Sequence, residues 1–443
     1  MDYQEAVQYL YGLIDYEKTP LSYSDLKLER MRELVERIGN PQKKYPVILV
    51  AGTKGKGSTA YLLMRLLSSW GLKCGLHSKP HLFTFRERIR VGEKLISPQD
   101  VALLLEYLIP VIEDMERHSP FGKPTYFEVS VAMAFLYFYF QEVQVAVVEV
   151  GLGGRLDATN VSDPVLTIIT PVSFDHMEIL GNTLSQIARE KAGILRPGVK
   201  LILAPQQEEA RKTLLDEASF KDVPVHQVEE LCRYRVLSRN PQGSHFRWEI
   251  ADWGSGEASL PLLGDHQITN FMTALLAGKE WGLPFIEENL KEALRGASWP
   301  GRIEILSYQP LVVFDVAHNQ ASFEQLLRTL KDFLRVEKSV FLLGFLKGKE
   351  YQKIADEVLP HAQCVILTQP LNPKAVNPFE VAPAFERRGV PVEIVEDPFE
   401  AREKAFRYIG EYHLPLVIAG SFYLARPFKR EFSVFCEEEV EIC

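Results

Sequence analysis

A short stretch near the N-terminus, residues 47–70, constrains the fold of this 443-residue chain more than any other. It opens with an unbroken apolar run at 47–51, typical of a strand buried on both faces of a parallel sheet. The glycine-rich sequence GTKGKGS follows at 52–58. Beyond it, apolar residues recur at steps of three and four up to Gly71, which predicts a helix with one buried face. A buried strand, a tight turn and a helix are therefore predicted in direct succession.

The glycine-rich turn predicts a phosphate-binding site. Backbone N–H groups of such a turn converge at the helix N-terminus, where the helix dipole adds partial positive charge. Lys56 is placed to reach the outer phosphates of a nucleotide, and the Ser58 hydroxyl suits Mg²⁺. The fit to the P-loop pattern is imperfect, because Val50 stands at the first glycine position and Gly57 separates Lys56 from Ser58. A turn without a ligand is the alternative, and the strand–turn–helix context favours the phosphate site.

Composition limits the class of protein. With 46% hydrophobic residues the chain can form full cores, and its length indicates two or three domains. The formal net charge of -9 argues against nucleic acid or an anionic membrane as a partner. The five cysteines are widely spaced without a C-x-x-C pair, which indicates a reducing compartment. The N-terminus resembles no targeting peptide and no apolar run is long enough to span a membrane, so we expect a soluble cytoplasmic protein.

Alternating strand and helix patterns predict an α/β fold with a P-loop-type, doubly wound N-terminal domain. Further buried strands are expected at 145–150 and 165–170, in the same sheet as 47–51. Between 232 and 263 the pattern changes to short alternating strands with turn-forming residues between them. This change predicts a small antiparallel layer at one edge of the domain, followed by a helix over about 266–281.

A linker is predicted at Trp299-Pro300-Gly301, where proline and glycine interrupt both helix and strand. We therefore expect one domain over 1–298 and a second over 299–443. The second, smaller domain repeats the α/β alternation without a phosphate loop of its own, and is predicted to be Rossmann-like. Its strands are expected at 311–314, 340–343, 364–367, 392–395 and 416–419. Its helices are expected at about 321–334, 350–358, 379–388 and 398–410.

Two polar residues follow buried strands of the first predicted sheet. If those strands neighbour 47–51, the side chains of Glu149 and His176 converge on the nucleotide. Mg²⁺ prefers oxygen ligands, which favours Glu149 together with Ser58. The alternatives are a capped loop carboxylate for Glu149 and a hydrogen-bonded histidine at a strand end for His176.

Other polar residues have ordinary structural explanations. Lys191 lies on a predicted helix and fits a surface salt-bridge lysine. Thr125 and Glu128 have the spacing of a capping box at the start of an apolar helix. The residues by themselves thus support a Mg²⁺-nucleotide site that faces a second α/β domain across a cleft, and they leave ligase, kinase and ATPase open.

Short motifs spread over residues 52–421 carry a more specific signal. They are GTKGKGS (52–58), ERI (87–89), TYFE (125–128), EVGLGGRLDATN (149–160), DH (175–176), REKAGI (189–194), WPGR (299–302), DVAHN (315–319) and GS (420–421). In this order they resemble the folylpolyglutamate synthase and dihydrofolate synthase family, within the Mur ligase superfamily.

This resemblance implies an ATP-dependent amide ligase. The carboxylate of dihydropteroate, or the γ-carboxylate of a reduced folate, would be activated as an acyl phosphate and then attacked by the amine of L-glutamate. Dihydropteroate, folate or both remain possible acceptors. A related ligase with a different carboxylate acceptor and an ATP-binding homologue with weakened catalysis are the alternatives. The resemblance also implies small-molecule partners only, a monomer, and closure of the two domains about a hinge.

The resemblance assigns roles residue by residue. ATP would be bound by Gly52, Thr53, Gly55, Lys56, Gly57, Ser58, Asn270, Arg302 and Asp315. Two Mg²⁺ ions are implied, with Ser58, Glu149 and His176 as ligands. Lys56, Lys191 and His318 would act in catalysis, Lys191 as a carbamate, while Thr125 and Phe127 would line the pterin pocket.

Several residues depart from the family pattern. Lys54 stands at a position that is often Asn, and Lys79 replaces a serine that is a metal ligand. Because a lysine ammonium cannot ligate Mg²⁺, either Glu149, His176 and water hold the first metal or Lys79 itself neutralises phosphate charge. The remaining departures are Gln320, Gly348 and Glu350, in the loops of the second domain.

Overall fold

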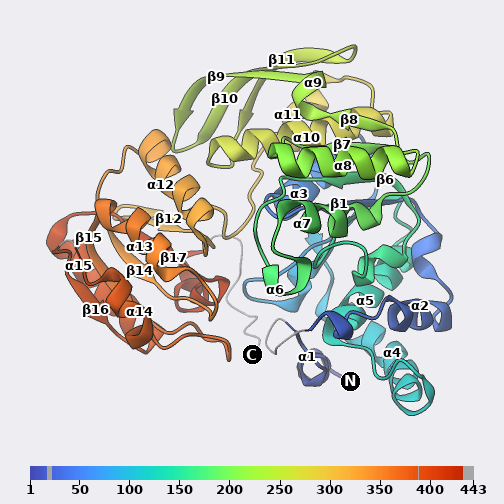
Figure 1. Cartoon of the computed structure of the whole chain (residues 1–443), viewed down its shortest axis with the longest axis horizontal. Coiled ribbons are helices and arrows are strands. Elements are labelled where there is room, and N and C mark those ends of the chain that lie inside the picture. Colours follow the sequence, from blue (N-terminus) through green and yellow to red (C-terminus); the bar gives the residue numbers. More distant parts are fainter. Residues whose placement is uncertain (17–21, 388, 433–443) are drawn as a thin grey trace.

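The computed structural model describes residues 1–16, 22–387 and 389–432. Two α/β lobes lie side by side, and a three-stranded sheet extends across the top of the molecule (Figure 1). The predicted fold class is confirmed. The proposed boundary at 298/299 lies between the last helix of the first lobe and the first strand of the second. Of the cysteines, Cys436 and Cys443 lie outside the described residues.

The N-terminal lobe is built on an eight-stranded sheet of order β4-β3-β2-β5-β1-β6-β7-β8. Its strands are Val47–Ala51 (β1), Cys74–His77 (β2), Ile89–Val91 (β3), Lys94–Leu95 (β4), Val145–Glu149 (β5), Pro164–Ile169 (β6), Leu201–Leu203 (β7) and Val225–Gln227 (β8). Neighbouring strands pair in parallel except at one edge, where β3 pairs antiparallel with both β2 and β4. Strand β1 pairs with β5 on one side and β6 on the other, so the carboxyl ends of these three predicted strands meet at one edge.

Helices cover both faces of this sheet because alternate residues of β1 enter different cores. Val47 and Leu49 pack with the helices of one face, while Ile48 and Val50 pack with those of the other. The second face is covered by α3 (Lys56–Ser69), α10 (Asp265–Trp281) and α11 (Glu287–Leu294). The remaining helices of this lobe are α1 (Tyr3–Gly12), α2 (Leu28–Arg37), α4 (Pro98–His118), α5 (Tyr126–Phe140), α6 (Met177–Leu180), α7 (Leu184–Lys191), α8 (Glu208–Phe220) and α9 (Val228–Leu231).

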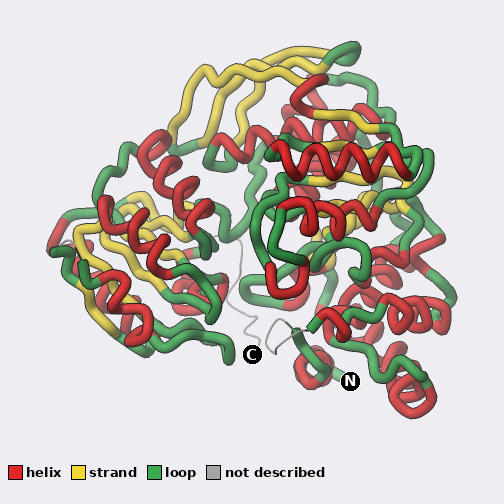
Figure 2. Tube along the Cα trace, viewed as in Figure 1, coloured by secondary structure: helices red, strands yellow, loops and turns green. Residues whose placement is uncertain are grey.

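The predicted antiparallel layer is confirmed as a three-stranded meander. It consists of β9 (Cys232–Asn240), β10 (Gly243–Ile250) and β11 (Gly254–Leu260), with β10 in the middle. Phe246, Trp248 and Ile250 alternate along β10 and are buried against the α10 side of the lobe. Figure 2 shows these strands at the top rim, apart from the two larger sheets.

The C-terminal lobe contains a six-stranded sheet of order β12-β13-β17-β14-β15-β16. Its strands are Glu304–Tyr308 (β12), Leu311–Phe314 (β13), Ser339–Leu343 (β14), Ala362–Leu367 (β15), Val392–Ile394 (β16) and Leu416–Ala419 (β17). Its helices are α12 (Gln320–Leu334), α13 (Tyr351–Val358), α14 (Pro378–Phe385) and α15 (Pro398–Tyr412). The predicted strands and helices of this lobe are confirmed within a few residues, and β12 adds an antiparallel edge strand.

The lobes contact each other beyond the linker. Phe83 extends from the loop after β2 into a core of the C-terminal lobe, where its ring centroid lies 4.9 Å from that of Phe432. Near the top of the molecule, Arg328 of α12 lies 3.7 Å from Asp265, the first residue of α10. Within the described parts of the chain, no helix has the length and apolar character needed to cross a membrane.

Candidate active site

The glycine-rich turn between β1 and α3 requires glycine at two positions. Gly52 and Gly55 have φ angles of +140° and +83°. A Cβ at Gly52 would collide with Thr170, and one at Gly55 would collide with the amide of Asn270. Thr53 and Lys54 donate their N–H groups to the Pro171 carbonyl at 3.0 and 3.1 Å, which ties the turn to the loop after β6. The predicted strand–turn–helix unit is therefore confirmed, with Gly55 capping α3.

Lys56 and Ser58 occupy the first turn of α3, at the end that carries partial positive charge. Ser58 is buried, and burial lowers the pKa of the Lys56 ammonium while Glu149 opposes that shift. A Cβ on the intervening Gly57 would lie 3.3 Å from Glu149 Oε2. The Glu149 carboxylate, at the end of β5, therefore packs directly against the backbone beside Ser58. This proximity follows from the pairing of β5 with β1.

Glu149 is the last residue of β5 and is only 4% exposed. Its Oε2 accepts a hydrogen bond from the Lys79 N–H at 3.1 Å. Burial raises the pKa of Glu149, and the Lys56 charge opposes this increase. A loop carboxylate that accepts one backbone N–H and a metal ligand are both compatible with this environment.

His176 lies in the same cavity but is less enclosed. Its side chain is 51% exposed, with Nδ1 3.8 Å from Glu178 and Nε2 4.0 Å from Asp175. In the chain as described, no three His, Cys, Asp or Glu side chains form a group able to hold a metal ion. Ser58, Glu149 and His176 thus share a cavity without forming a closed cage, and their role as metal ligands stays a prediction.

Lys191 is not the surface salt-bridge residue that its helical position favoured. It is the last residue of α7, is 3% exposed, and donates from Nζ to the Gly52 carbonyl at 2.9 Å. Burial lowers the pKa of this ammonium to about 7. The lowered pKa favours the neutral amine relative to an exposed lysine, and only the neutral amine can react with CO₂ to form a carbamate.

The C-terminal lobe supplies charged groups to the opposite wall. Asp315 follows β13 and accepts the N–H groups of Ile303 and Ala317 at 2.8 and 2.7 Å. Burial raises its pKa to about 6. His318 contacts the Val316 carbonyl through Nδ1 at 2.9 Å, and burial lowers the pKa of its imidazole to about 3.

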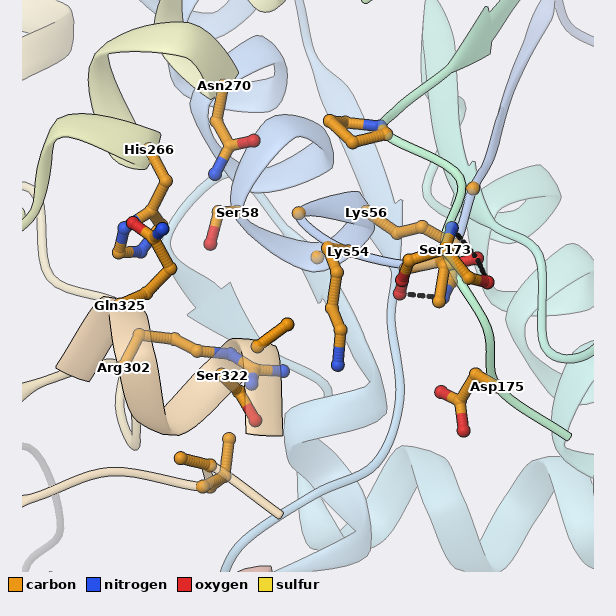
Figure 3. Close-up of a pocket in the computed structure, with 18 of the residues that line it drawn as sticks. Lys54, Lys56, Ser58, Ser173, Asp175, His266, Asn270, Arg302, Ser322 and Gln325 are labelled. Carbon is orange, nitrogen blue, oxygen red and sulfur yellow. Dashed lines mark hydrogen bonds between the residues drawn. The ribbon is translucent and has the colours of Figure 1, made fainter. Parts of the chain in front are cut away.

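Arg302 and Lys54 reach toward the middle of the cavity from opposite lobes (Figure 3). Arg302 is held with its guanidinium 5.2 Å from the ring centroid of Phe422. Burial lowers the pKa of Lys54 to about 8. Lys54, which stands where the family often has Asn, thus adds a further basic side chain to the cavity. It lies near Arg302, which the resemblance assigns to ATP binding.

One cavity of about 580 Å³ between the lobes collects the predicted residues. Its lining includes Gly52, Thr53, Gly55, Lys56, Gly57, Ser58, Glu149, His176, Lys191, Asn270, Arg302, Asp315 and His318. Sequence reasoning missed two further lining residues, His266 and Asp175, as site residues. Burial alone would raise the pKa of Asp175, but nearby cations, His176 first, hold it well below its usual range.

A second cavity of about 780 Å³ adjoins the first. Thr125 and Phe127 line it, and Lys79 and His176 belong to both cavities. The capping box is confirmed, because Glu128 N–H donates to Thr125 Oγ1 and Thr125 N–H donates to Glu128 Oε2. Whether Thr125 and Phe127 contact a substrate stays a prediction, and their position in a cavity separate from the phosphate cradle is compatible with it.

The second-lobe departures have local explanations. Gly348 has a φ of +80°, a backbone conformation that glycine favours, in the loop that lines the second cavity. Gln320 begins α12 and donates to Glu357 at 2.9 Å. Glu350 pairs with Lys353 on the surface. None of these three residues lines the first cavity.

Comparison with known protein families identifies the class of protein to which the chain belongs. Residues 50–278 match the Mur ligase middle domain, and residues 301–422 match the Mur ligase glutamate ligase domain. Together they cover most of both lobes, with the linker between them. The chain is therefore a Mur ligase.

Individual relatives give the family. The chain is 35% identical to the dihydrofolate synthase/folylpolyglutamate synthase of Bacillus subtilis, over 81% of this chain and 84% of the relative. It is 30% identical to the folylpolyglutamate synthase of Lacticaseibacillus casei, over 96% and 97%. Folylpolyglutamate synthase of Mycobacterium tuberculosis, solved with ADP, superposes with a TM-score of 0.88 at 30% identity, over 98% and 99%. The chain belongs to the folylpolyglutamate synthase and dihydrofolate synthase family, and the predicted family is confirmed. It is an ATP-dependent, amide-forming ligase.

Proposed function

We propose that this chain joins L-glutamate to dihydropteroate, to the γ-carboxylate of reduced folates, or to both, with cleavage of ATP to ADP and phosphate. The observation that carries the proposal is the junction of the two cavities. The phosphate cradle opens into the first, the predicted pterin-pocket residues line the second, and Lys79 and His176 border both. A triphosphate and an acceptor bound in these cavities would meet end to end.

The chemistry requires two displacements. A carboxylate oxygen of the acceptor attacks the γ-phosphorus of ATP, the bond to the β–γ bridging oxygen breaks, and ADP leaves. The glutamate nitrogen then attacks the acyl carbon, gives up a proton, and the carbon–oxygen bond to phosphate breaks. Activation is needed because oxide is a poor leaving group, whereas phosphate is a good one. Catalysis in this scheme comes from positioning and charge neutralisation.

Residues of both lobes have roles in this scheme. The glycine-rich turn and Lys56 bind the triphosphate, while Asn270, Arg302 and Asp315 contact the nucleotide from α10 and the second lobe. Since the two walls belong to different lobes, rotation about the linker completes the site. When Mg²⁺ is bound it neutralises phosphate charge, and Ser58 and Glu149 are the residues that would hold it beside the cradle.

His318 and Lys191 are the proposed catalytic groups besides Lys56. A backbone carbonyl only accepts hydrogen bonds, so Nδ1 of His318 carries the proton that faces Val316. In the neutral ring Nε2 then has its lone pair available to accept a hydrogen bond from the glutamate amine. Lys191 as a carbamate would place a carboxylate next to the cradle instead of an ammonium, which supports a role in orienting the metal.

Phosphate release from purified protein tests the proposal. ATP, Mg²⁺ and glutamate are supplied with dihydropteroate or tetrahydrofolate, and products are identified by mass spectrometry. Release that requires both glutamate and a pteridine, with a product heavier by one glutamyl residue, is expected. Release with glutamate and another carboxylate only would establish a different Mur-type ligase. ATP binding without turnover would establish a weakened homologue.

We further propose that the enzyme acts as a monomer in the cytoplasm. Cys74, Cys232 and Cys364 are buried free thiols, which supports a reducing compartment. Light scattering coupled to size-exclusion chromatography is expected to give the mass of one chain, 50.4 kDa. A dimer mass would overturn the monomer.

A further inference from the structure

Lys79 lies where the two cavities join. It belongs to the loop after β2, and its N–H donates to Glu149 Oε2 at 3.1 Å. A few residues later the same loop is anchored in the C-terminal lobe by Phe83. The backbone at position 79 is thus held beside the phosphate cradle, and the side chain lines both cavities.

The ammonium of Lys79 makes a cation–π contact with an aromatic ring. Its Nζ lies 5.5 Å from the centroid of the Phe127 ring. The Phe127 ring is closely packed, because a Cβ on Gly151 would collide with it and the His77 ring centroid lies 6.1 Å away. The cation is therefore positioned at the boundary between the cavity for phosphate and the cavity for the acceptor.

The charge of Lys79 influences the pKa values of neighbouring ionisable groups. Burial is the main influence on the pKa values of Glu149, Lys56 and His176, and Lys79 contributes to each of them. It favours the ionised form of Glu149 and disfavours the cationic forms of the other two. The location of the ammonium itself follows from its contact with Phe127 and from the position of Lys79 in the lining of both cavities.

A metal ion does not fit at this position. A lysine ammonium donates hydrogen bonds and repels a divalent cation, so it cannot complete a metal site with Glu149 and His176. The described residues also offer no third His, Cys, Asp or Glu to replace it. Yet the reaction brings a carboxylate against a triphosphate, and their repulsion must be offset where they meet.

We propose that the Lys79 ammonium is a built-in cation that offsets the repulsion between the acceptor carboxylate and the terminal phosphoryl group, in place of one of the two Mg²⁺ ions that the family pattern implies. The enzyme then works with a single Mg²⁺, held by Ser58 and Glu149. The inference rests on the proposed function for the identity of the acceptor. The number of metal ions bound with nucleotide does not depend on it.

Counting metal ions tests the proposal without turnover. Manganese(II) replaces magnesium, AMPPCP (a β,γ-methylene analogue of ATP) replaces ATP, and bound Mn²⁺ is measured by electron paramagnetic resonance. Wild type and Lys79→Met are expected to bind one Mn²⁺ per nucleotide, and Lys79→Ser two, because the serine hydroxyl completes a second ligand set with Glu149 and His176. Lys212→Met, an exposed position on α8, is the matched control and is expected to match wild type. Two ions in wild type would overturn the proposal, as would one ion in Lys79→Ser.

Turnover as a function of magnesium concentration is the second test. Lys79→Met is expected to lower kcat about tenfold or more at every Mg²⁺ concentration, since one preorganised charge is lost. Lys79→Ser is expected to be slow at low Mg²⁺ and to recover at high Mg²⁺, and Lys79→Arg to retain most activity. A Lys79→Met enzyme with normal kcat and only a raised KM for the acceptor would overturn the proposal.

The two tests separate different failures. If no pteridine supports turnover, the proposed acceptor is wrong, but the Mn²⁺ count still decides the role of Lys79. If one variant fails to fold, as judged by circular dichroism and thermal melting, the wild-type count and the remaining variant keep the test decisive.

Discussion

The N-terminal wall of the cavity between the lobes is built around a backbone turn, whereas the C-terminal wall is formed by side chains of a separate lobe. The glycine turn is fixed by hydrogen bonds to Pro171 and by glycines that admit no side chain. The opposite wall presents Arg302, Asp315 and His318 from loops that follow the linker or β13. A backbone cradle is formed before ligand arrives, whereas side chains on a separate lobe act only once that lobe is in place. The first wall should therefore determine binding, and the second should determine rate.

The largest effect is expected from Lys56, whose charged side chain makes it an exception to this division although it lies on the N-terminal wall. Lys56→Met should lower kcat about 100- to 1,000-fold, because a donor aimed at the developing charge is removed. Steady-state kinetics with saturating ATP measure the loss. A variant within a few fold of wild type would show that the cradle binds phosphate without Lys56.

Gly55→Ala tests the steric requirement of the cradle. Left-handed strain of about 1–2 kcal/mol and the collision with Asn270 should weaken ATP binding about tenfold or more. Gly39→Ala is the matched control, since Gly39 has a φ of +81° but open space around its Cβ. Calorimetry should show weakened nucleotide binding for Gly55→Ala only. Equal affinities in the two variants would contradict the cradle geometry.

Asp315→Asn tests the side-chain wall. The amide cannot replace both acceptor contacts to Ile303 and Ala317, so Arg302 and the loop should shift. We expect kcat to fall about 10- to 100-fold, and nucleotide affinity to change less than in Gly55→Ala. A larger loss of affinity than of rate would reverse the proposed division between the walls.

The buried Lys191 predicts a pH-dependent stability. Its pKa is lowered from 10.5 in the unfolded chain to about 7 in the folded one, so folding releases a proton between these values. This contribution destabilises the protein fully below pH 7 and disappears as pH rises toward 10.5. The free energy of unfolding is measured with urea at pH 7 and pH 9 in carbonate-free buffer. It should change less between these two pH values in Lys191→Met than in wild type. Equal pH dependence in the two proteins would contradict the lowered pKa of Lys191.

The smallest effect is expected at the helix cap in the second cavity. Thr125→Ala should cost about 1 kcal/mol of stability and leave ATP affinity unchanged. Ser97→Ala removes the same kind of cap from α4, outside both cavities. If Thr125 also contacts the acceptor, only Thr125→Ala raises its KM. Equal kinetics for both variants would leave Thr125 as a cap alone.

Much of the fold follows from local patterns. Buried strands such as β1 and β5 are continuous apolar runs, and parallel strands bring their carboxyl ends together, so the meeting of Glu149 with the glycine turn was predictable. Several elements were not predicted, α8 and β12 among them. The buried face of α8 relies partly on the small residues Ala210 and Ala218, and β12 is a half-buried edge strand, so both have weak periodic signals.

The site residues that sequence reasoning misjudged or missed depend on tertiary contacts. Lys191 ends an ordinary-looking helix, and only the packing of α7 against the turn directs its ammonium to Gly52. His266 lies at the start of α10, and its place in the cavity follows from the position of that helix against α3. Neither position carries a periodic or capping signal that marks it as part of the site.

Phe83 gives the two lobes a mechanical connection that the linker alone does not provide. Separating the lobes fully would withdraw this ring from its socket, at a cost of about 2 kcal/mol. The same loop carries Lys79, so withdrawal of the Phe83 ring would also strain the hydrogen bond from the Lys79 N–H to Glu149. The position of the second lobe and the geometry around Glu149 are therefore coupled through the backbone between Lys79 and Phe83.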